Sequence, residues 1–225
     1  ADTRGFEVRD MVALDRVSSP TLSPDGSVVV FAKHVMDKDV VKASTGLWMR
    51  NLLTRDMVPP RQFTPEGWNV NSPAFSPDGK SLYFLSAKSG TQQLYSVPLQ
   101  GGAPQQLTAF ALDVGNYQLS PDGTQLLFSS ETFADCKADF GCTQKRLADR
   151  KASKSAGVVH DRLFVRHWDA WADGRRDRLF VATLPTGTSA PVSAAVSLTH
   201  AVDGDAASKP LGDASEYSCA PDGKS

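Results

Sequence analysis

Short apolar stretches recur along the chain, and each is bounded by proline, glycine or aspartate. Ser27 to Ala32, Ser81 to Leu85 and Gln125 to Phe128 are three such stretches. They are too short for regular buried helices, and runs of this kind between turn residues are typical of β-strands. The pattern therefore predicts a chain built mainly of short strands.

One turn sequence separates these strands repeatedly. Ser-Pro-Asp-Gly begins at Ser23, Ser76 and Ser120, and a fourth copy begins with Ala220. Proline presets φ at the second turn position, aspartate tolerates the third, and glycine supplies the positive φ needed to leave the turn. The motif predicts a recurring β-hairpin, in which the aspartates have a structural role. These aspartates are Asp25, Asp78, Asp122 and Asp222.

A second landmark closes each repeat after a proline-containing turn. It reads Gln62-Phe63-Thr64, Gln106-Leu107-Thr108 and Ser197-Leu198-Thr199. A further apolar strand precedes each closing motif, so every unit holds about four short strands in ~45 residues, as a β-propeller blade does. The third strands are expected at 47–50, 93–97 and 178–182. The sequence thus predicts an all-β, incomplete propeller of about three four-stranded blades plus the start of a fourth.

The repeat also predicts the domain organisation. We expect an N-terminal segment at 1–17, blades at about 18–64, 65–108 and 109–199, and a partial blade at 200–225. The third blade carries an insertion over 131–176, because only one closing motif lies between the third and fourth turns. Three blades and a fragment cannot close a ring and would leave unpaired edges. We therefore expect further chain, or a partner, to supply the remaining blades.

The first half of the insertion contains a pair of cysteines and a polar segment. Cys136 and Cys142 are six residues apart, and a disulfide between them would close a small loop and add about 2 kcal/mol of stability. The alternative is two free surface thiols; a disulfide would indicate an oxidising compartment. A short helix is predicted over 143–154, where good helix formers are frequent. Cys219 is expected in a strand, as a small buried hydrophobe.

Charge and motifs exclude several function classes. The formal net charge is −1, which argues against a nucleic-acid partner. No apolar run approaches the ~20 residues that span a bilayer, and the first residues have no apolar stretch typical of a signal peptide. No Gly-x-Ser-x-Gly, phosphate loop or His-Glu-x-x-His occurs, and the four histidines lack metal-ligand spacing. We expect no catalytic residue, metal site or cofactor within these residues.

The Ser-Pro-Asp-Gly blades resemble the propellers of TolB and of the prolyl oligopeptidase family of serine peptidases. The cysteine segment, the tryptophan-rich segment 166–174 and the opening 6–11 resemble the dipeptidyl aminopeptidase (dipeptidyl-peptidase 5-like) branch. The resemblance implies a seven- or eight-bladed propeller capping a C-terminal α/β-hydrolase domain of the same protein, which would carry the Ser-Asp-His triad. It implies a periplasmic or secreted serine exopeptidase that releases dipeptides from free N-termini of peptides, and it is compatible with a homodimer.

An enzyme that releases dipeptides must hold the α-ammonium group of its substrate at a fixed distance from the nucleophile. A desolvated ammonium group needs a carboxylate partner. Peptidases of this branch commonly place such acids on a propeller insertion. The resemblance therefore implies Asp169 as the ammonium ligand, with Asp173 behind it. It implies Arg166 as the partner that orients Asp169 or as an anchor for a substrate carbonyl. Trp168 and Trp171 would form the walls of the pocket. The alternative is that both tryptophans pack against neighbouring blades and Asp169 caps a turn.

Two other functions remain open from the sequence. One is a non-catalytic, TolB-like binding propeller of the cell envelope. The other is a propeller enzyme with a metal in its channel, which is disfavoured because no inward ligand set recurs. The tryptophan-rich insertion favours the peptidase, since a plain scaffold does not need it.

Overall fold

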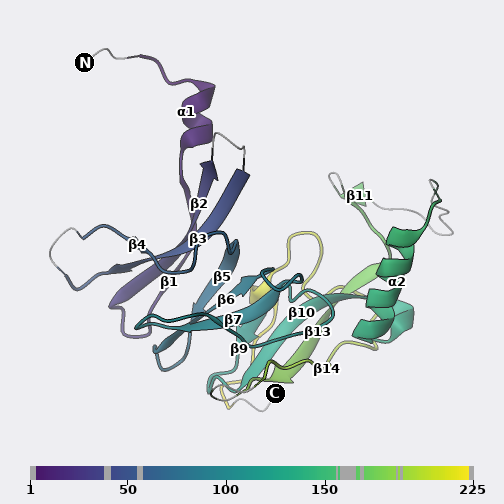
Figure 1. Ribbon diagram of the computed structural model, residues 1–225. Helices are drawn as coiled ribbons and strands as arrows, with labels where there is room; N and C mark the ends of the chain where they lie inside the picture. Colours follow the sequence, from purple (N-terminus) through teal and green to yellow (C-terminus); the bar gives the residue numbers. More distant parts are fainter. Residues whose placement is uncertain are drawn as a thin grey trace. The chain divides into compact units, whose positions relative to one another are not determined.

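The computed structural model describes residues 4–37, 42–54, 58–155, 157, 166–167, 170–185, 187 and 190–222. The chain divides into two compact units, Ala1–Leu107 and Thr108–Ser225. Three four-stranded sheets account for most of the regular structure, and all their strand pairs are antiparallel (Figure 1).

The first unit contains two sheets, each with its strands in chain order. Blade 1 consists of β1 (Arg16–Leu22), β2 (Val28–Asp37), β3 (Lys42–Asn51) and β4 (Arg61–Gln62). Blade 2 consists of β5 (Val70–Phe75), β6 (Ser81–Ser86), β7 (Gln93–Pro98) and β8 (Gln105–Gln106). A short helix, α1 (Val8–Ala13), precedes blade 1. Four sequential antiparallel strands are the structure of a propeller blade.

The second unit contains the third sheet, blade 3, in the order β14-β13-β10-β9. Its strands are β9 (Tyr117–Leu119), β10 (Gln125–Phe133), β13 (Arg175–Thr183) and β14 (Val196–Ser197). Between β10 and β13 lie the 3-10 helix η1 (Ala134–Cys136), helix α2 (Phe140–Ala152) and a hairpin of β11 (Arg166–His167) and β12 (Ala170–Trp171). A second 3-10 helix, η2 (Ala214–Glu216), follows the blade. The predicted all-β fold with three four-stranded blades is confirmed.

Each Ser-Pro-Asp-Gly turn is closed by the same hydrogen bonds. In the first, the Ser23 hydroxyl donates to Asp25 Oδ1 at 2.6 Å and accepts from the Val28 N–H at 2.9 Å. Gly26 has φ +70°, as the turn requires. The Ser23 hydroxyl bond, followed by the bonds from Ser27, lowers the pKa of Asp25 to about 2. The serine-to-aspartate bond recurs in the next two turns, from Ser76 to Asp78 and from Ser120 to Asp122.

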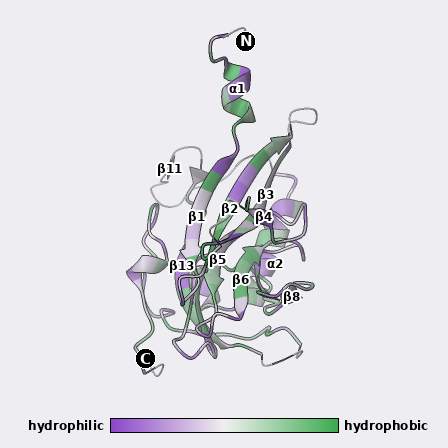
Figure 2. Ribbon diagram, turned by 90° about the vertical axis from the view of Figure 1, so that its left-hand side faces the viewer, coloured by the Kyte–Doolittle hydropathy of each residue, from purple (hydrophilic) through white to green (hydrophobic). Residues whose placement is uncertain are grey.

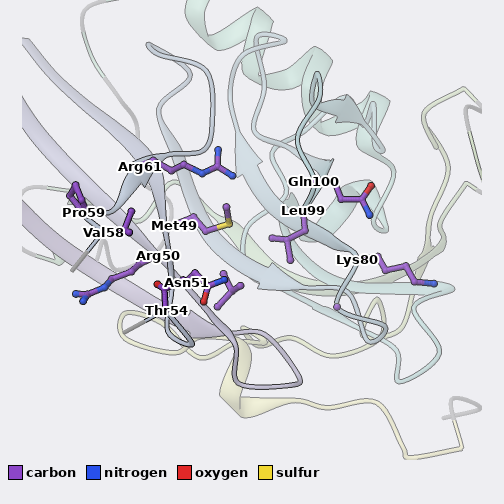
Figure 3. A pocket seen from close by; sticks show the side chains of 12 residues that line it. Met49, Arg50, Asn51, Thr54, Val58, Pro59, Arg61, Lys80, Leu99 and Gln100 are labelled. Carbon is purple, nitrogen blue, oxygen red and sulfur yellow. The ribbon is translucent and has the colours of Figure 1, made fainter. Parts of the chain in front are cut away.

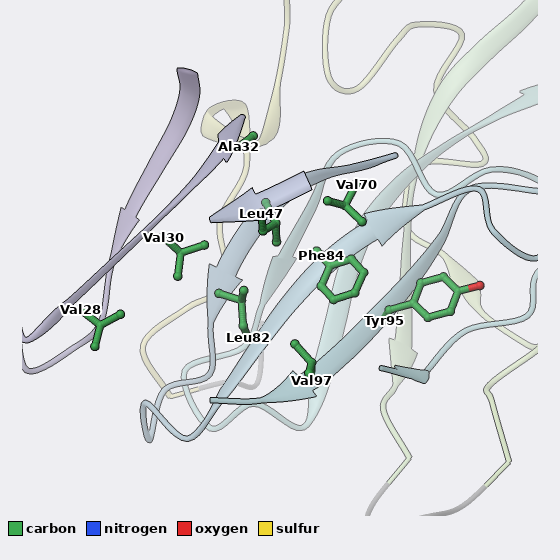
Figure 4. Close-up of a cluster of buried hydrophobic side chains, with 9 residues drawn as sticks. All are labelled: Val28, Val30, Ala32, Leu47, Val70, Leu82, Phe84, Tyr95 and Val97. Carbon is green, nitrogen blue, oxygen red and sulfur yellow. The ribbon is translucent and has the colours of Figure 1, made fainter. Parts of the chain in front are cut away.

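The first unit is held together by a core between its two blades. Val30 and Leu47 of blade 1 and Leu82 and Phe84 of blade 2 are fully buried in one cluster, and Figure 4 shows them facing each other. Burial alternates from Val28 to Ala32 in β2, as expected for a strand with one buried face, whereas the last three residues of β6 are all buried. Figure 2 shows the hydrophobic stretches on β6, together with the mixed surface of α1, which has no buried residue.

An aromatic stack forms the core of the second unit. The rings of Phe128 and Phe180 lie 5.6 Å apart, and Phe110 stacks on Phe128 at 4.8 Å. Phe140, from the first turn of α2, contacts Phe180 at 4.7 Å. Helix α2 is therefore pinned to the sheet by its first residue.

Three local features differ from the sequence-based expectations. Helix α2 begins three residues earlier than predicted, because the Asp139 side chain accepts the Cys142 N–H at 3.1 Å and caps it. Strands β10 and β13 extend into the expected insertion, where Phe133 pairs with Arg175, so the connecting segment is 134–174. The strand position predicted for Cys219 is wrong: this residue lies in irregular chain after η2 and is only partly buried.

Within the described residues, no helix is long and apolar enough to cross a membrane.

Candidate functional site

The connecting segment 134–174, called here the blade-3 insertion, leaves and rejoins the sheet at adjacent positions. Its first part folds back onto the strand it leaves. The predicted disulfide between Cys136 and Cys142 is confirmed, with Cα atoms 5.7 Å apart. Next to it, the buried Thr143 hydroxyl accepts the backbone N–H of Phe133 at 3.3 Å. The disulfide thus joins η1 to α2 within the insertion, and the hydrogen bond of Thr143 ties α2 to the end of β10.

Two arginines of α2 hold the same strand end. The guanidinium groups of Arg146 and Arg150 lie 4.4 and 4.5 Å from the ring centroid of Phe133. Arg146 also donates to Asp135 Oδ1 at 2.6 Å. Arginines at i and i+4 lie on one helix face, so both guanidinium groups can contact the same ring. Arginine forms such cation–π contacts more often than lysine. The helix is fixed relative to β10 along much of its length.

The returning arm of the insertion is held by Asp173. Its backbone carbonyl accepts from Arg150 at 3.1 Å, while its carboxylate accepts the Arg175 N–H at 3.0 Å and the Arg175 Nε–H at 2.6 Å. Burial raises the pKa of Asp173, but the hydrogen bonds from Arg175 outweigh it, and the pKa lies below its ordinary value. In this structure the carboxylate holds the arm; its proposed part in substrate binding stays a prediction.

The hairpin of β11 and β12 carries two of the other predicted substrate-binding residues. Arg166 pairs with Trp171, and its guanidinium carbon lies 5.4 Å from the indole centroid. Trp171 is 52% exposed, so it is not part of a blade core. Trp168 and Asp169 lie outside the described residues. The assignment of Asp169 to the substrate ammonium therefore stays a prediction.

An acidic pair that the sequence did not predict lies at the base of the insertion. Glu131 of β10 and Asp177 of β13 are direct register partners. Like charges opposite each other in a sheet are unfavourable. Here Arg175 Nη1 lies 2.8 Å from Glu131 Oε2, and Lys209 forms ion pairs with both Glu131 and Asp205. The cations of this cluster offset the repulsion.

Asp177 has the most perturbed carboxyl group of this cluster. Burial is the main cause that raises its pKa to about 6; Lys209 opposes the shift and Glu131 adds to it. Glu131 was expected inside the insertion, so its pairing with Asp177 was not foreseen. No local pattern in the sequence marks the continuation of β10 through Thr132 and Phe133, where seven of the nine strand residues are buried without alternation.

A buried arginine joins the chain beyond β14 to the sheet. Arg178 is 2% exposed and donates through Nη1 to the carbonyls of Thr199 and Val202, at 2.6 and 3.0 Å. Asp177 and Arg178 are neighbours in β13, so they face opposite sides of the sheet. Among the residues that the structure describes, no group of three or more His, Cys, Asp or Glu side chains is placed to hold a metal ion.

The first unit has a pocket of about 500 Å³ between blades 1 and 2, at the end where their Ser-Pro-Asp-Gly turns lie (Figure 3). Its apolar lining includes Val28, Met49 and Leu99. The other described residues that line it are Arg50, Asn51, Thr54, Val58, Pro59, Arg61, Gly79, Lys80 and Gln100. The described lining residues include none of those predicted to bind substrate.

Comparisons with known proteins identify peptidases among the relatives. The chain is 28% identical over 214 residues to "Dipeptidyl-peptidase 5" of Porphyromonas endodontalis, covering 95% of this chain and 29% of that protein. It is 28% identical over 213 residues to "Dipeptidyl-peptidase 5" of Porphyromonas gingivalis, with the same two shares. The chain thus spans less than a third of the length of these relatives. The resemblance seen in the sequence is confirmed.

A solved structure shows the same fold. The acylaminoacyl peptidase of Pyrococcus horikoshii aligns with a TM-score of 0.58 at 15% identity, over 85% of this chain and 26% of that one. At this identity the likeness concerns the fold alone. The family comparison is more direct, because the TolB beta propeller domain family matches residues 16–154, which span blades 1 and 2 and the beginning of blade 3. The chain therefore belongs to the TolB β-propeller domain family.

Proposed function

We propose that this chain is the propeller portion of a serine peptidase that releases dipeptides from the free N-termini of peptides. The observation that carries the proposal is the similarity to dipeptidyl-peptidase 5, which runs through both units of the chain. Because those relatives are much longer, they leave room for a separate catalytic domain. The propeller would limit access to that domain and help to bind the substrate N-terminus.

The architecture of the blade-3 insertion supports the second of these roles. A side chain that binds the substrate N-terminus two residues from the scissile bond must be held in place, because small misplacements of the bound substrate strongly lower turnover. The disulfide, the two arginines around Phe133 and the contacts of Asp173 provide such a support. We place Asp169 as the ammonium ligand on this supported segment, with Trp168, Trp171 and Arg166 around it.

The same disulfide supports a location outside the reducing cytosol. Disulfides persist in the periplasm and in secreted proteins, and they are rare where thiols are kept reduced. We therefore propose a periplasmic or secreted protein.

Substrate and variant kinetics test the proposal on the full protein that contains this chain. Hydrolysis of a dipeptidyl p-nitroanilide with a free amine is expected, with little hydrolysis of its N-acetylated form. Asp169→Asn should lower kcat/KM for the free-amine substrate by about tenfold or more, since an ammonium loses its charged partner. The matched control is Asp149→Asn, because Asp149 is an exposed carboxylate of the same insertion that pairs with Lys145. Unchanged turnover in Asp169→Asn would remove Asp169 from the site.

A non-catalytic binding propeller is the second candidate, and the match to the TolB propeller family favours it. It predicts no labelling by serine-directed reagents and no hydrolysis of either substrate. It also predicts a stable complex with an envelope protein, detected by crosslinking in intact cells. Labelling together with free-amine hydrolysis would exclude it.

A further inference from the structure

The pocket between blades 1 and 2 has no part in the proposed peptide hydrolysis, and its origin lies in two prolines. The β3–β4 ladder ends at the pair Met49 and Arg61. The residues before Arg61 are Pro59 and Pro60, which have no N–H with which to continue the ladder. The chain therefore leaves β3 at this point, and a hollow opens between it and blade 2.

The floor of this pocket is apolar. Figure 3 shows the side chains of Met49 and Leu99 close together in its centre. Val58, which lines the pocket, is 56% exposed, and the nearby Leu52 and Leu53, which are not among the described lining residues, are 46% and 74% exposed. Single exposed leucines are ordinary, whereas a cluster around a hollow is typical of a binding surface.

One cation is directed to the same face of the sheet as this floor. Arg61 is the register partner of Met49, so the two side chains share a face. Arg50 follows Met49 and therefore projects from the opposite face; Figure 3 shows it pointing away from Met49 and Leu99. A guanidinium group over an apolar floor is suited to a carboxylate attached to an apolar group.

Two amide side chains add hydrogen-bonding groups to the rim. Asn51 and Gln100 both line the pocket. The Asn51 Oδ1 atom accepts the Leu53 N–H at 2.8 Å, which fixes the orientation of the side chain and leaves its amide nitrogen as a donor. Such groups match peptide carbonyls, and they would gain nothing from a hydrocarbon chain.

We propose that this pocket binds the C-terminal end of a peptide whose last residues are apolar. The terminal carboxylate pairs with Arg61, the last side chain lies on Met49 and Leu99, and Asn51 and Gln100 bond the peptide groups. The volume of about 500 Å³ lies in the range of small-ligand sites. The site needs no catalytic step, so it stands or falls separately from the peptidase proposal.

Calorimetric titration of the full protein tests this assignment. The probes are N-acetylated alanyl-leucyl-leucine with a free carboxylate, the same peptide as its C-terminal amide, and decanoate. The free acid is expected to bind about tenfold more tightly than the amide, because the amide loses the charged hydrogen bonds to Arg61. Acetylation blocks the free amine that the proposed peptidase activity requires.

Variants separate the pocket from general charge effects. Arg61→Gln should weaken the free acid about tenfold and leave the amide unchanged. Lys88→Gln is the matched control, because Lys88 is an exposed cation of the same unit that lies 6.0 Å from the Trp68 ring and outside the pocket. Arg61 is exposed, so its replacement should leave the fold intact, which circular dichroism checks. Equal binding of acid and amide, no effect of Arg61→Gln, or tighter binding of decanoate than of the peptide would overturn the proposal.

Discussion

Charged side chains of blade 3 illustrate how a single residue responds to its neighbours in the sheet. Asp177 faces Glu131 across the ladder, while Lys209 pairs with Glu131 and Asp205. Burial raises the pKa of Asp177 to about 6 from an ordinary 3.8. The folded state therefore favours the protonated carboxyl. Asp177 leaves the free energy of unfolding almost unchanged below about pH 4, where the carboxyl is protonated in both the folded and the unfolded state. It lowers this free energy as the pH rises from about 4 to about 6, because the unfolded state loses the proton first.

Replacing this residue tests that sign. Asp177→Asn removes the buried charge, so the variant should be more stable than the parent at pH 8, by about 1 kcal/mol after allowance for partial exposure. The gain should disappear near pH 4, where the carboxyl is protonated in both states. Urea unfolding at the two pH values measures it. A variant that is less stable at pH 8 than at pH 4, relative to the parent, would contradict the assignment.

Turn glycines give a second prediction at this scale. Gly26 has φ +70° and no atom within 4 Å of an added Cβ, so Gly26→Ala would strain the backbone without a clash. The expected loss is about 1 kcal/mol of unfolding free energy. Gly5→Ala is the control, since Gly5 also has open space but no positive φ. Equal stability of the two variants in urea unfolding would mean that the turn does not demand glycine.

At the scale of elements, helix α2 links the disulfide to the returning arm of the insertion. The disulfide fixes the first turn of the helix, and Arg150 near its last turn bonds the carbonyl of Asp173. The helix thus contacts both the end of β10 and the residues just before β13, and it holds the two segments in a fixed relation. These contacts support the described parts of the insertion next to β10 and β13.

Hydrogen exchange measures this link. Arg150→Ala should speed amide exchange in residues 173–175, because the arm loses its bond to the helix, while Lys151→Ala, an adjacent exposed cation, should leave it unchanged.

Removing the disulfide tests the other end of the helix. Cys136→Ser with Cys142→Ser should cost about 2 kcal/mol of unfolding free energy and speed exchange throughout α2. Unaltered exchange in the helix would mean that the packing of Phe140 and the contacts of Thr143, Arg146 and Arg150 hold it without the disulfide.

The elements that the sequence predicted are those whose signal is local. Ser23, Asp25 and Gly26 each have a bond or a dihedral angle that their own turn requires, so the motif alone identified the hairpins. The same holds for the helix in the insertion and for the disulfide across six residues. The extension of β10 to Phe133 depends on a partner more than forty residues away in the sequence, and no local pattern reveals it.

The candidate site was predicted less completely than the fold, for a related reason. The ion pair of Arg175 with Glu131 and that of Lys209 with Glu131 join segments distant in sequence. The role of Asp173 as a support for the arm depends on Arg150, which lies in a separate element. Cys219 was misassigned because a strand precedes each of the first three turn motifs, whereas the chain between η2 and the fourth motif is irregular.

At the scale of the whole molecule, we propose a propeller that is part of a larger enzyme. The chain spans 29% of the dipeptidyl-peptidase 5 relatives, and blades 1 and 2 pack face to face in a well-formed core. We propose that the blade-3 insertion binds the substrate N-terminus. The pocket at the turn end of blades 1 and 2 is assigned to a peptide C-terminus, and neither assignment depends on the other.

Product analysis tests the central claim most directly. The full protein is incubated with an unmodified decapeptide, and the products are followed by mass spectrometry. We expect successive loss of dipeptides from the free N-terminus, and no loss after acetylation of that terminus. Release of single residues, removal of an acylated residue, or an intact decapeptide after prolonged incubation would contradict it.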